Sequence, residues 1–137
     1  MTVACTTIVV RSTELDSYGH VNNARYVEYF EWGRFDWLAA TGLAERLEPG
    51  GTSYVVVDLH VSYRKEARMG ETLTLSTYLS KIGRSSVVVT QTLTKAEGVV
   101  VANGEVTLVA FDPTTRRARR LPEAHLEILD KVLVASE

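Results

Sequence analysis

Cysteine is almost absent from this sequence, because Cys5 is its single representative and one thiol cannot build an internal disulfide framework. Since Cys5 lies in an apolar stretch, we expect it to be a reduced thiol inside the core. The sequence also lacks any uninterrupted run of about 18 apolar residues, so no membrane-spanning helix is predicted. Its start, "MTVACTTIVVRS", has neither a basic segment nor a long apolar one, and no signal peptide is expected. These absences predict a soluble, cytoplasmic protein.

A basic excess is missing as well. The formal net charge is -2 at pH 7, which argues against a nucleic-acid partner. No glycine-rich phosphate loop of the P-loop or dinucleotide type occurs, so no nucleotide cofactor is expected. With 137 residues, of which 45% are hydrophobic and 23% charged, the chain is typical of a single globular domain spanning 1–137. A domain of this size can bury a core without metals or crosslinks.

What the sequence contains first is a short strand and a long helix. The stretch 3–11 is rich in β-branched residues, which favours a strand. From Asn23 to about Thr41 there is no proline and Gly33 is the one internal glycine, so this stretch is predicted to be helical, with Gly42 as its C-terminal cap. The helix is apolar on most sides, and we expect protein to wrap around it.

The next part of the chain changes to a period of two, which indicates strands. Alternating apolar residues mark four such segments, at 53–65, 71–81, 85–95 and 99–111. The breaks at Met69-Gly70, Gly83-Arg84 and Glu97-Gly98 are short enough for antiparallel hairpins. The stretch "DPTTRR" at 112–117 ends the last strand, and a short helix is expected over 122–134. The order predicts an α+β fold, in which a curved antiparallel five-stranded sheet wraps around the long central helix.

The densest polar cluster directly precedes the long helix. Asp16 lies just before the helix start, where unpaired backbone N–H groups and the helix dipole concentrate positive potential. Asn22 and Asn23 are good capping residues, and Gly19 permits a sharp turn or a close approach of the backbone. Such donors can polarise a carbonyl, while a carboxylate attacks it or removes a proton from water. This pair suits an activated acyl group such as a thioester.

The same residues carry a family resemblance. The stretch "DSYGHVNNARY" at 16–26 resembles the signature of the hotdog-fold acyl-CoA thioesterases, in the 4-hydroxybenzoyl-CoA thioesterase family. The likeness extends from the first strand through "YVEYFE" at 26–31 to the four later strands. It implies hydrolysis of an acyl-CoA or acyl-carrier-protein thioester to a free acid and a thiol, with no metal and no organic cofactor. It also implies a homodimer, often assembled into a tetramer, with sites at the subunit interface.

Roles follow from the resemblance position by position. Asp16 matches the family's catalytic aspartate, and the backbone N–H near Asn23 matches the group that polarises the thioester carbonyl. Glu31 matches a glutamate on the central helix whose role we interpret as structural. Because family members differ in whether the catalytic carboxylate precedes the helix or lies on it, Glu28 and Glu31 remain alternatives to Asp16. The alternative is that Asp16 has a purely structural role, as a turn or capping residue.

Other candidates cluster around Asp16. His20 is a candidate general base or substrate-orienting group, and otherwise makes a structural hydrogen bond within the loop. No second histidine, cysteine or suitably spaced carboxylate indicates a metal site with it. Asn22 is expected to tie the loop to the helix start, with a thioester contact as the alternative, and Tyr26 is the kind of aromatic that can lie close to Asp16. His60 is interpreted as part of a packed or solvated polar face and His125 as a surface residue.

Coenzyme A phosphates need cationic partners. The resemblance places the stretches 63–68 and 81–86 near the pantetheine entrance, so Arg64, Arg84 and Ser85 are predicted to bind substrate. The stretch "RRARR" at 116–120 is interpreted as a solvated turn, with a grip on a neighbouring subunit's ligand as the alternative.

Two other functions compete with hydrolysis. A hotdog hydratase or dehydratase needs a base against the α- or β-carbon of the acyl group, in a loop pattern that 16–26 does not resemble. A non-catalytic module would bind acyl-CoA in the same groove without cleaving it. The role of Asp16 separates these possibilities.

Overall fold

The computed structural model describes residues 3–134 of the chain. The helices are α1 (Asn23–Thr41) and α2 (Glu123–Val132), with short 3-10 turns η1 (Ser12–Glu14), η2 (Leu43–Arg46) and η3 (Ala96–Gly98). The strands are β1 (Val3–Val9), β2 (Ser53–Tyr63), β3 (Thr72–Ile82), β4 (Ser86–Lys95), β5 (Val99–Asp112) and β6 (Arg117–Ala118). No helix among the described residues is long and apolar enough to cross a membrane.

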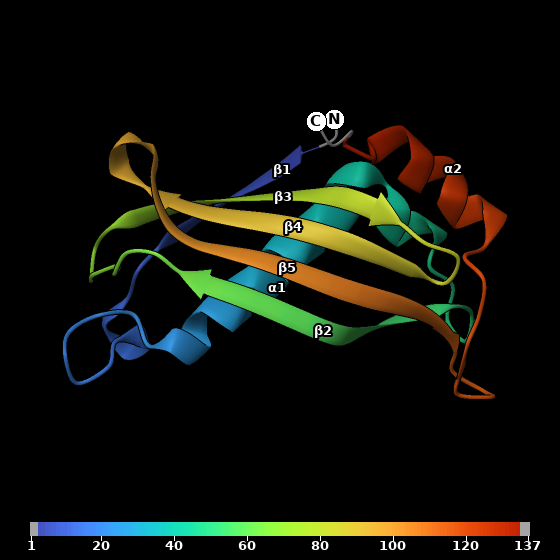
Figure 1. Cartoon of the computed structure of the whole chain (residues 1–137), viewed down its shortest axis with the longest axis horizontal. Coiled ribbons are helices and arrows are strands. Elements are labelled where there is room, and N and C mark those ends of the chain that lie inside the picture. Colours follow the sequence, from blue (N-terminus) through green and yellow to red (C-terminus); the bar gives the residue numbers. More distant parts are fainter. Residues whose placement is uncertain (1–2, 135–137) are drawn as a thin grey trace.

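The strands form one antiparallel sheet in the order β1-β3-β4-β5-β2, with the two-residue β6 added against β5. Figure 1 shows the sheet bent around α1, which crosses behind the strands, while α2 lies at one end. This arrangement confirms the predicted hotdog fold: five long antiparallel strands, a long helix and a short C-terminal helix.

Helix α1 begins and ends where its local signals predict. The side-chain oxygen of Asn22 accepts the backbone N–H of Ala24 at 2.9 Å, which is the expected N-terminal cap. At the other end Gly42 adopts a left-handed conformation, with φ of 83°, and its N–H bonds to the carbonyl of Ala39. Both caps are local, and both bounds agree with the prediction.

Gly33 lets α1 approach the sheet closely. A Cβ atom at this position would meet the Leu75 side chain, would lie 2.8 Å from Thr77 Oγ1 and would lie 2.9 Å from Gln91 Nε2. These distances are shorter than real Cβ contacts, so glycine is required for the helix to rest directly on β3 and β4.

The fully buried Gln91 fixes the helix to the sheet through polar contacts. Its amide nitrogen donates to the Phe30 carbonyl at 2.8 Å and to Thr77 Oγ1 at 2.9 Å. Its amide oxygen accepts from the guanidinium of Arg34 at 3.2 Å. The network therefore satisfies a polar side chain that burial would otherwise penalise.

Two apolar clusters fill the space between helix and sheet. The first lies toward the polar loop and contains Ile8, Val10, Val21, Tyr26, Tyr29, Phe30, Ala67, Leu73, Leu75, Leu93, Val101 and Ala102. The second lies toward α2 and contains Ala4, Trp37, Leu43, Leu79, Val87, Val89, Ala110, Leu121, Leu129 and Val132.

Two predictions of side-chain burial were wrong. Cys5 is exposed, because β1 turns its neighbours Ala4 and Thr6 toward the core and Cys5 falls on the alternate face. His125 is buried, since one ring nitrogen lies 2.7 Å from the Tyr54 hydroxyl and the other bonds to the carbonyl of Arg46 at 3.1 Å. That carbonyl only accepts, so Nε2 carries a proton.

The hairpin expected at Met69-Gly70 does not form. Strand β2 pairs with β5 at one edge of the sheet, while β3 pairs with β1 and β4. The connection therefore crosses between strands that are not neighbours. The hairpins expected at Gly83-Arg84 and Glu97-Gly98 are confirmed by the β3–β4 and β4–β5 pairs.

The outer side of α1 is less covered than predicted. The helix packs mainly against β1 and β3, and Trp32 and Phe35 remain 41% and 61% exposed. Edge strand β2 is also exposed over most of its length, and an irregularity between Val56 and Asp58 interrupts its alternation. The chain thus presents an apolar strip along β2 and the adjoining side of α1.

Candidate functional site

The polar loop before α1 closes on itself around Asp16. The backbone N–H of Asp16 donates to the His20 carbonyl at 2.7 Å, and the N–H of Gly19 donates to the Asp16 carbonyl at 3.1 Å. Gly19 has a φ of +79°, and a Cβ there would meet nothing within 4 Å. Glycine is thus needed for the turn itself. Figure 1 shows the loop at one end of the molecule, beside the start of α1.

The carboxylate of Asp16 has one oxygen engaged and one available. Oδ1 accepts the backbone N–H groups of Tyr18 at 2.9 Å and of His20 at 3.1 Å. Within residues 3–134 no group donates a hydrogen bond to Oδ2. The turn therefore fixes the orientation of the carboxylate and leaves Oδ2 for chemistry.

The first turn of α1 leaves one amide without an acceptor. Ala24 N–H is taken by the Asn22 side chain and Arg25 N–H by the Asn22 carbonyl, each at 2.9 Å. The N–H of Asn23 has no acceptor within the described part of the chain. Positive potential from the helix dipole is concentrated at this amide.

Asp16 and Asn23 line the same pocket, of about 340 Å³. Its complete lining is Asp16, His20, Val21, Asn23, Tyr26, Tyr63, Arg64, Lys65 and Glu66. The structure thus brings together five residues predicted for the site: Asp16, His20, Asn23, Tyr26 and Arg64. A carboxylate and an unpaired amide can attack and polarise a thioester carbonyl. Cationic side chains beside them can bind the phosphates of coenzyme A.

His20 is held by a carboxylate of the strand connection. Its Nε2 lies 3.3 Å from an oxygen of Glu66. The hydrogen bond from Arg68 and the nearby His20 hold the pKa of Glu66 below its usual range. Glu66 is therefore anionic near neutral pH, and its contact with Nε2 orients the His20 ring.

Hydrogen bonds to buried groups anchor the polar loop at both of its ends. Glu14 accepts the Tyr29 hydroxyl at 2.9 Å through its side chain and the Asn22 N–H at 2.9 Å through its carbonyl. Val21 N–H donates to the Ala67 carbonyl at 2.8 Å. Burial and the Glu14 contact raise the pKa of Tyr29, so its hydroxyl remains a donor. Asp16 therefore lies on a loop held at both ends.

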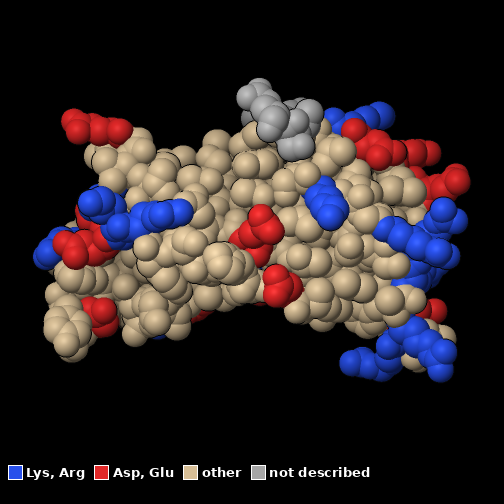
Figure 2. Space-filling model, in the orientation of Figure 1, with Lys and Arg blue, Asp and Glu red and all other residues tan. Residues whose placement is uncertain are grey.

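The remaining predicted site residues lie outside this pocket. Asn22 caps α1 as expected, and its side-chain oxygen is occupied by that bond. Arg84 and Ser85 form the turn between β3 and β4, where their carbonyls accept from Leu121 and Ala110. Figures 1 and 2 place this turn and a cluster of basic residues at the end opposite the polar loop. The residues 116–120 of that cluster are exposed, as predicted.

The alternative carboxylates do not share the pocket with Asp16. Glu28 is exposed and pairs with Arg25 at 2.9 Å. Glu31 is exposed and faces a different pocket, farther along α1. This arrangement favours Asp16.

Sequence reasoning missed four pocket residues, Val21, Tyr63, Lys65 and Glu66. The alternation marks the segment 53–65, which contains Tyr63, as a strand, and the stretch 63–68 is predicted to supply only cations. The bridge between His20 and Arg68 brings this connection to the loop. Such a contact depends on distant chain pairing, and no local signal marks it.

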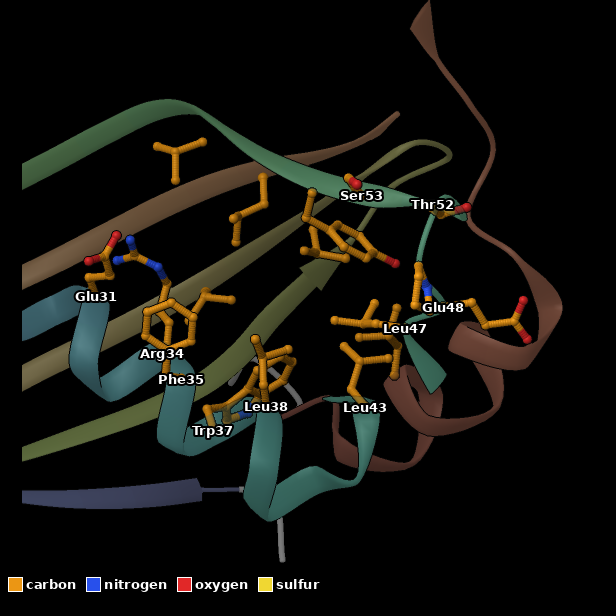
Figure 3. A pocket seen from close by; sticks show the side chains of 17 residues that line it. Glu31, Arg34, Phe35, Trp37, Leu38, Leu43, Leu47, Glu48, Thr52 and Ser53 are labelled. Carbon is orange, nitrogen blue, oxygen red and sulfur yellow. The ribbon is translucent and has the colours of Figure 1, made fainter. Parts of the chain in front are cut away.

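A second pocket, of about 490 Å³, lies between the C-terminal half of α1 and the strands β2, β4 and β5. Figure 3 shows apolar side chains such as Leu38 and Leu43 across its middle, with Glu31 and Arg34 at one end. Burial lowers the pKa of Arg34, and attraction to Glu31 opposes that effect. Burial also raises the pKa of Tyr54, another lining residue, to about 12. The pocket can accommodate an apolar chain.

Among the described residues, no group of three or more histidine, cysteine, aspartate or glutamate side chains is arranged to hold a metal ion.

Comparison with known proteins gives consistent matches. Residues 10–129 match a protein family described as the Thioesterase-like superfamily. The chain is 34% identical to the long-chain acyl-CoA thioesterase FadM of Escherichia coli, over 93% of this chain and 98% of that protein. It is 29% identical to the acyl-CoA thioester hydrolase YbgC of Escherichia coli O157:H7, over 81% and 84% of the two chains. The crystal structure of YbaW, a probable thioesterase from Escherichia coli, superposes with a TM-score of 0.86, at 34% identity and with 95% and 98% coverage.

Proposed function

The chain belongs to the Thioesterase-like superfamily, and on this basis we propose that it hydrolyses acyl-CoA thioesters to a free acid and coenzyme A. The observation that carries the proposal is that Asp16 and the unpaired amide of Asn23 line one pocket. Relatives of similar length named as acyl-CoA thioesterases support the choice of substrate. The narrower placement in the 4-hydroxybenzoyl-CoA thioesterase family stays a prediction, as does an acyl-carrier-protein substrate.

In this proposal the Asn23 N–H donates to the thioester carbonyl oxygen. Negative charge develops on that oxygen as the carbonyl carbon becomes tetrahedral, and a preformed donor stabilises it without reorganisation. The dipole of α1 adds to the same effect. Asn22 supports the amide indirectly, because its bonds to Ala24 and Arg25 hold the first turn.

Asp16 Oδ2 acts by one of two routes. As a base it takes a proton from a water molecule, whose oxygen attacks the carbonyl carbon; the carbon–sulfur bond then breaks and the thiolate is protonated. As a nucleophile it attacks the carbon itself, expels the thiolate and forms an anhydride that water cleaves. One turnover in water enriched in heavy oxygen separates the routes, since only the second places the label in Asp16.

In this proposal the coenzyme A part and the acyl chain of the substrate bind in different pockets. Arg64 and Lys65 lie beside Asp16, where they can bind the phosphates or the pantetheine amides. His20, oriented by Glu66, can hydrogen-bond the leaving sulfur or the attacking water. The larger apolar pocket along α1 provides a site for the acyl chain.

We further propose that the active unit is a homodimer, as the resemblance implies, and that its interface is formed by β2. The edge strand exposes Val55, Val56 and Val57 by 44%, 41% and 56%. An open apolar edge strand promotes association with another chain, and a second copy of β2 is the complementary partner. Arg84 and Ser85 lie far from Asp16 in their own chain (Figure 1), so they bind substrate only if the assembly brings them to the pocket of another subunit. A tetramer built from two such dimers is the alternative assembly.

The test is a hydrolysis screen of the purified protein against short, long and aromatic acyl-CoAs, with detection of free thiol. We expect turnover of at least one class, abolished or strongly reduced by Asp16→Asn. A protein that binds these esters and cleaves none of them would be an acyl-CoA-binding module, and the proposal would be wrong.

A further inference from the structure

Tyr63 joins the end of β2 to the start of α1. Its hydroxyl donates to the backbone carbonyl of Asn23 at 2.9 Å. Tyr63 is the last residue of β2, and Asn23 is the first residue of α1. The half-exposed tyrosine also forms part of the wall of the Asp16 pocket. This bond therefore restrains the residue that carries the unpaired amide.

The hydrogen bond is not explained by the need to satisfy a buried polar group. Asn23 is exposed, and half of the Tyr63 surface is exposed too, so water can solvate both partners. A hydrogen bond between solvated groups contributes about 1 kcal/mol or less to stability. The bond matters more for the position of the helix than for stability. Helix α1 packs mainly on β1 and β3, and this bond fastens its first turn to β2 as well.

The Tyr63 ring is itself held in place. It packs edge-on against Tyr26, with ring centroids 5.3 Å apart and an interplanar angle of 67°. Tyr26 is buried and packs in turn against Tyr29 at 6.0 Å, which bonds to Glu14. Aromatic pairs of this geometry are favourable and directional. The hydroxyl thus approaches the helix from a fixed ring.

From these contacts we propose that Tyr63 is a positioning residue, which holds the first turn of α1 so that the Asn23 N–H faces the thioester oxygen. The inference rests on the proposed function. An oxyanion donor must lie within about 2.7–3.1 Å of its target, so small rotations of the peptide weaken it. Because the donor acts mainly on the transition state, its alignment affects kcat more than substrate binding.

The test is Tyr63→Phe, which keeps the ring and its packing on Tyr26 and removes the hydroxyl. We expect kcat for acyl-CoA hydrolysis to fall about tenfold, with KM changed less than about twofold and the unfolding midpoint unchanged. Tyr78→Phe is the matched control, because Tyr78 lies on β3 and lines neither pocket. An unchanged kcat, or a rise in KM alone, would overturn the inference.

A negative result for Tyr63→Phe can be distinguished from failure of the proposed function. Turnover by the wild-type protein and its loss in Asp16→Asn stand or fall without Tyr63. Amide hydrogen exchange provides a readout that needs no catalysis. We expect Ala24 and Arg25, the amides of the first turn, to exchange faster in Tyr63→Phe than in Tyr78→Phe or the wild type. Equal exchange would show that Tyr63 does not restrain this turn.

Discussion

Asp16 and His20 bond to each other twice. The Asp16 N–H donates to the His20 carbonyl at 2.7 Å, and Asp16 Oδ1 accepts the His20 N–H at 3.1 Å. One carboxylate oxygen thus builds the turn while the other remains available in the pocket. The bland interpretation of Asp16 as a turn residue and the catalytic one are therefore compatible, since each uses a different oxygen.

The Tyr29–Glu14 contact is predicted to stabilise the loop that carries Asp16. Tyr29→Phe removes one of the two donors to Oε1 of the buried Glu14 and leaves the Arg11 N–H. A hydrogen bond to a charged group contributes about 1.5–3 kcal/mol, so the variant should be less stable. Urea denaturation measures the loss. Tyr18→Phe is the control, because Tyr18 is 82% exposed and its hydroxyl makes no recorded bond within the described residues. Equal stability of the two variants would contradict the prediction.

Gly33→Ala is predicted to destabilise the protein despite the better helix propensity of alanine. The substitution favours an isolated helix by about 1 kcal/mol. Here the new methyl group meets Leu75, Thr77 and Gln91 at distances that force them to move. Overpacking of this kind costs about 1–3 kcal/mol, so thermal unfolding should occur at a lower temperature.

Alanine is preferred over glycine where the helix is exposed, so the reverse substitution is the destabilising one there. Ala40 lies on the open side of α1, and Ala40→Gly should cost about 1 kcal/mol through propensity alone. A Gly33→Ala variant that is more stable than the wild type would show that α1 does not rest directly on the sheet.

Val57→Lys is predicted to weaken self-association through β2. Val57 is 56% exposed at the irregular point of the edge strand, and a lysine there opposes edge-to-edge pairing. Light scattering should report a dimer or tetramer for the wild type and a smaller species for the variant. Val9→Lys, at an exposed position of the other edge strand β1, is the control. A monomeric wild type, or a variant of unchanged size, would contradict association through β2.

Local signals explain why so much of the fold could be predicted. Asn22 and Gly42 directly flank α1 and mark both of its ends. The hairpins at Gly83-Arg84 and Glu97-Gly98 join neighbouring strands, so turn residues and alternation are sufficient there. Asp16 and Asn23 are likewise close in sequence, and their shared position at the start of a helix could be read directly.

Features that depend on distant pairing could not be predicted in this way. Strand β2 pairs with β5 rather than with β3, and that pairing carries Tyr63 and Glu66 to the pocket. The position of Cys5 depends on which alternate face of β1 meets the core, and His125 is buried by contacts from β2 and η2. Each outcome is decided by the assembled sheet.

The most direct measurement of the central claim is kcat of Asp16→Asn for an acyl-CoA that the wild type hydrolyses. Asparagine retains an oxygen for the Tyr18 and His20 amides and replaces the free Oδ2 with an uncharged NH2 group, whereas Asp16→Ala removes both oxygens. We predict that kcat falls by about a hundredfold or more in Asp16→Asn, with substrate affinity and the urea midpoint close to wild type. An unchanged kcat would contradict the account and direct attention to Glu28 or Glu31.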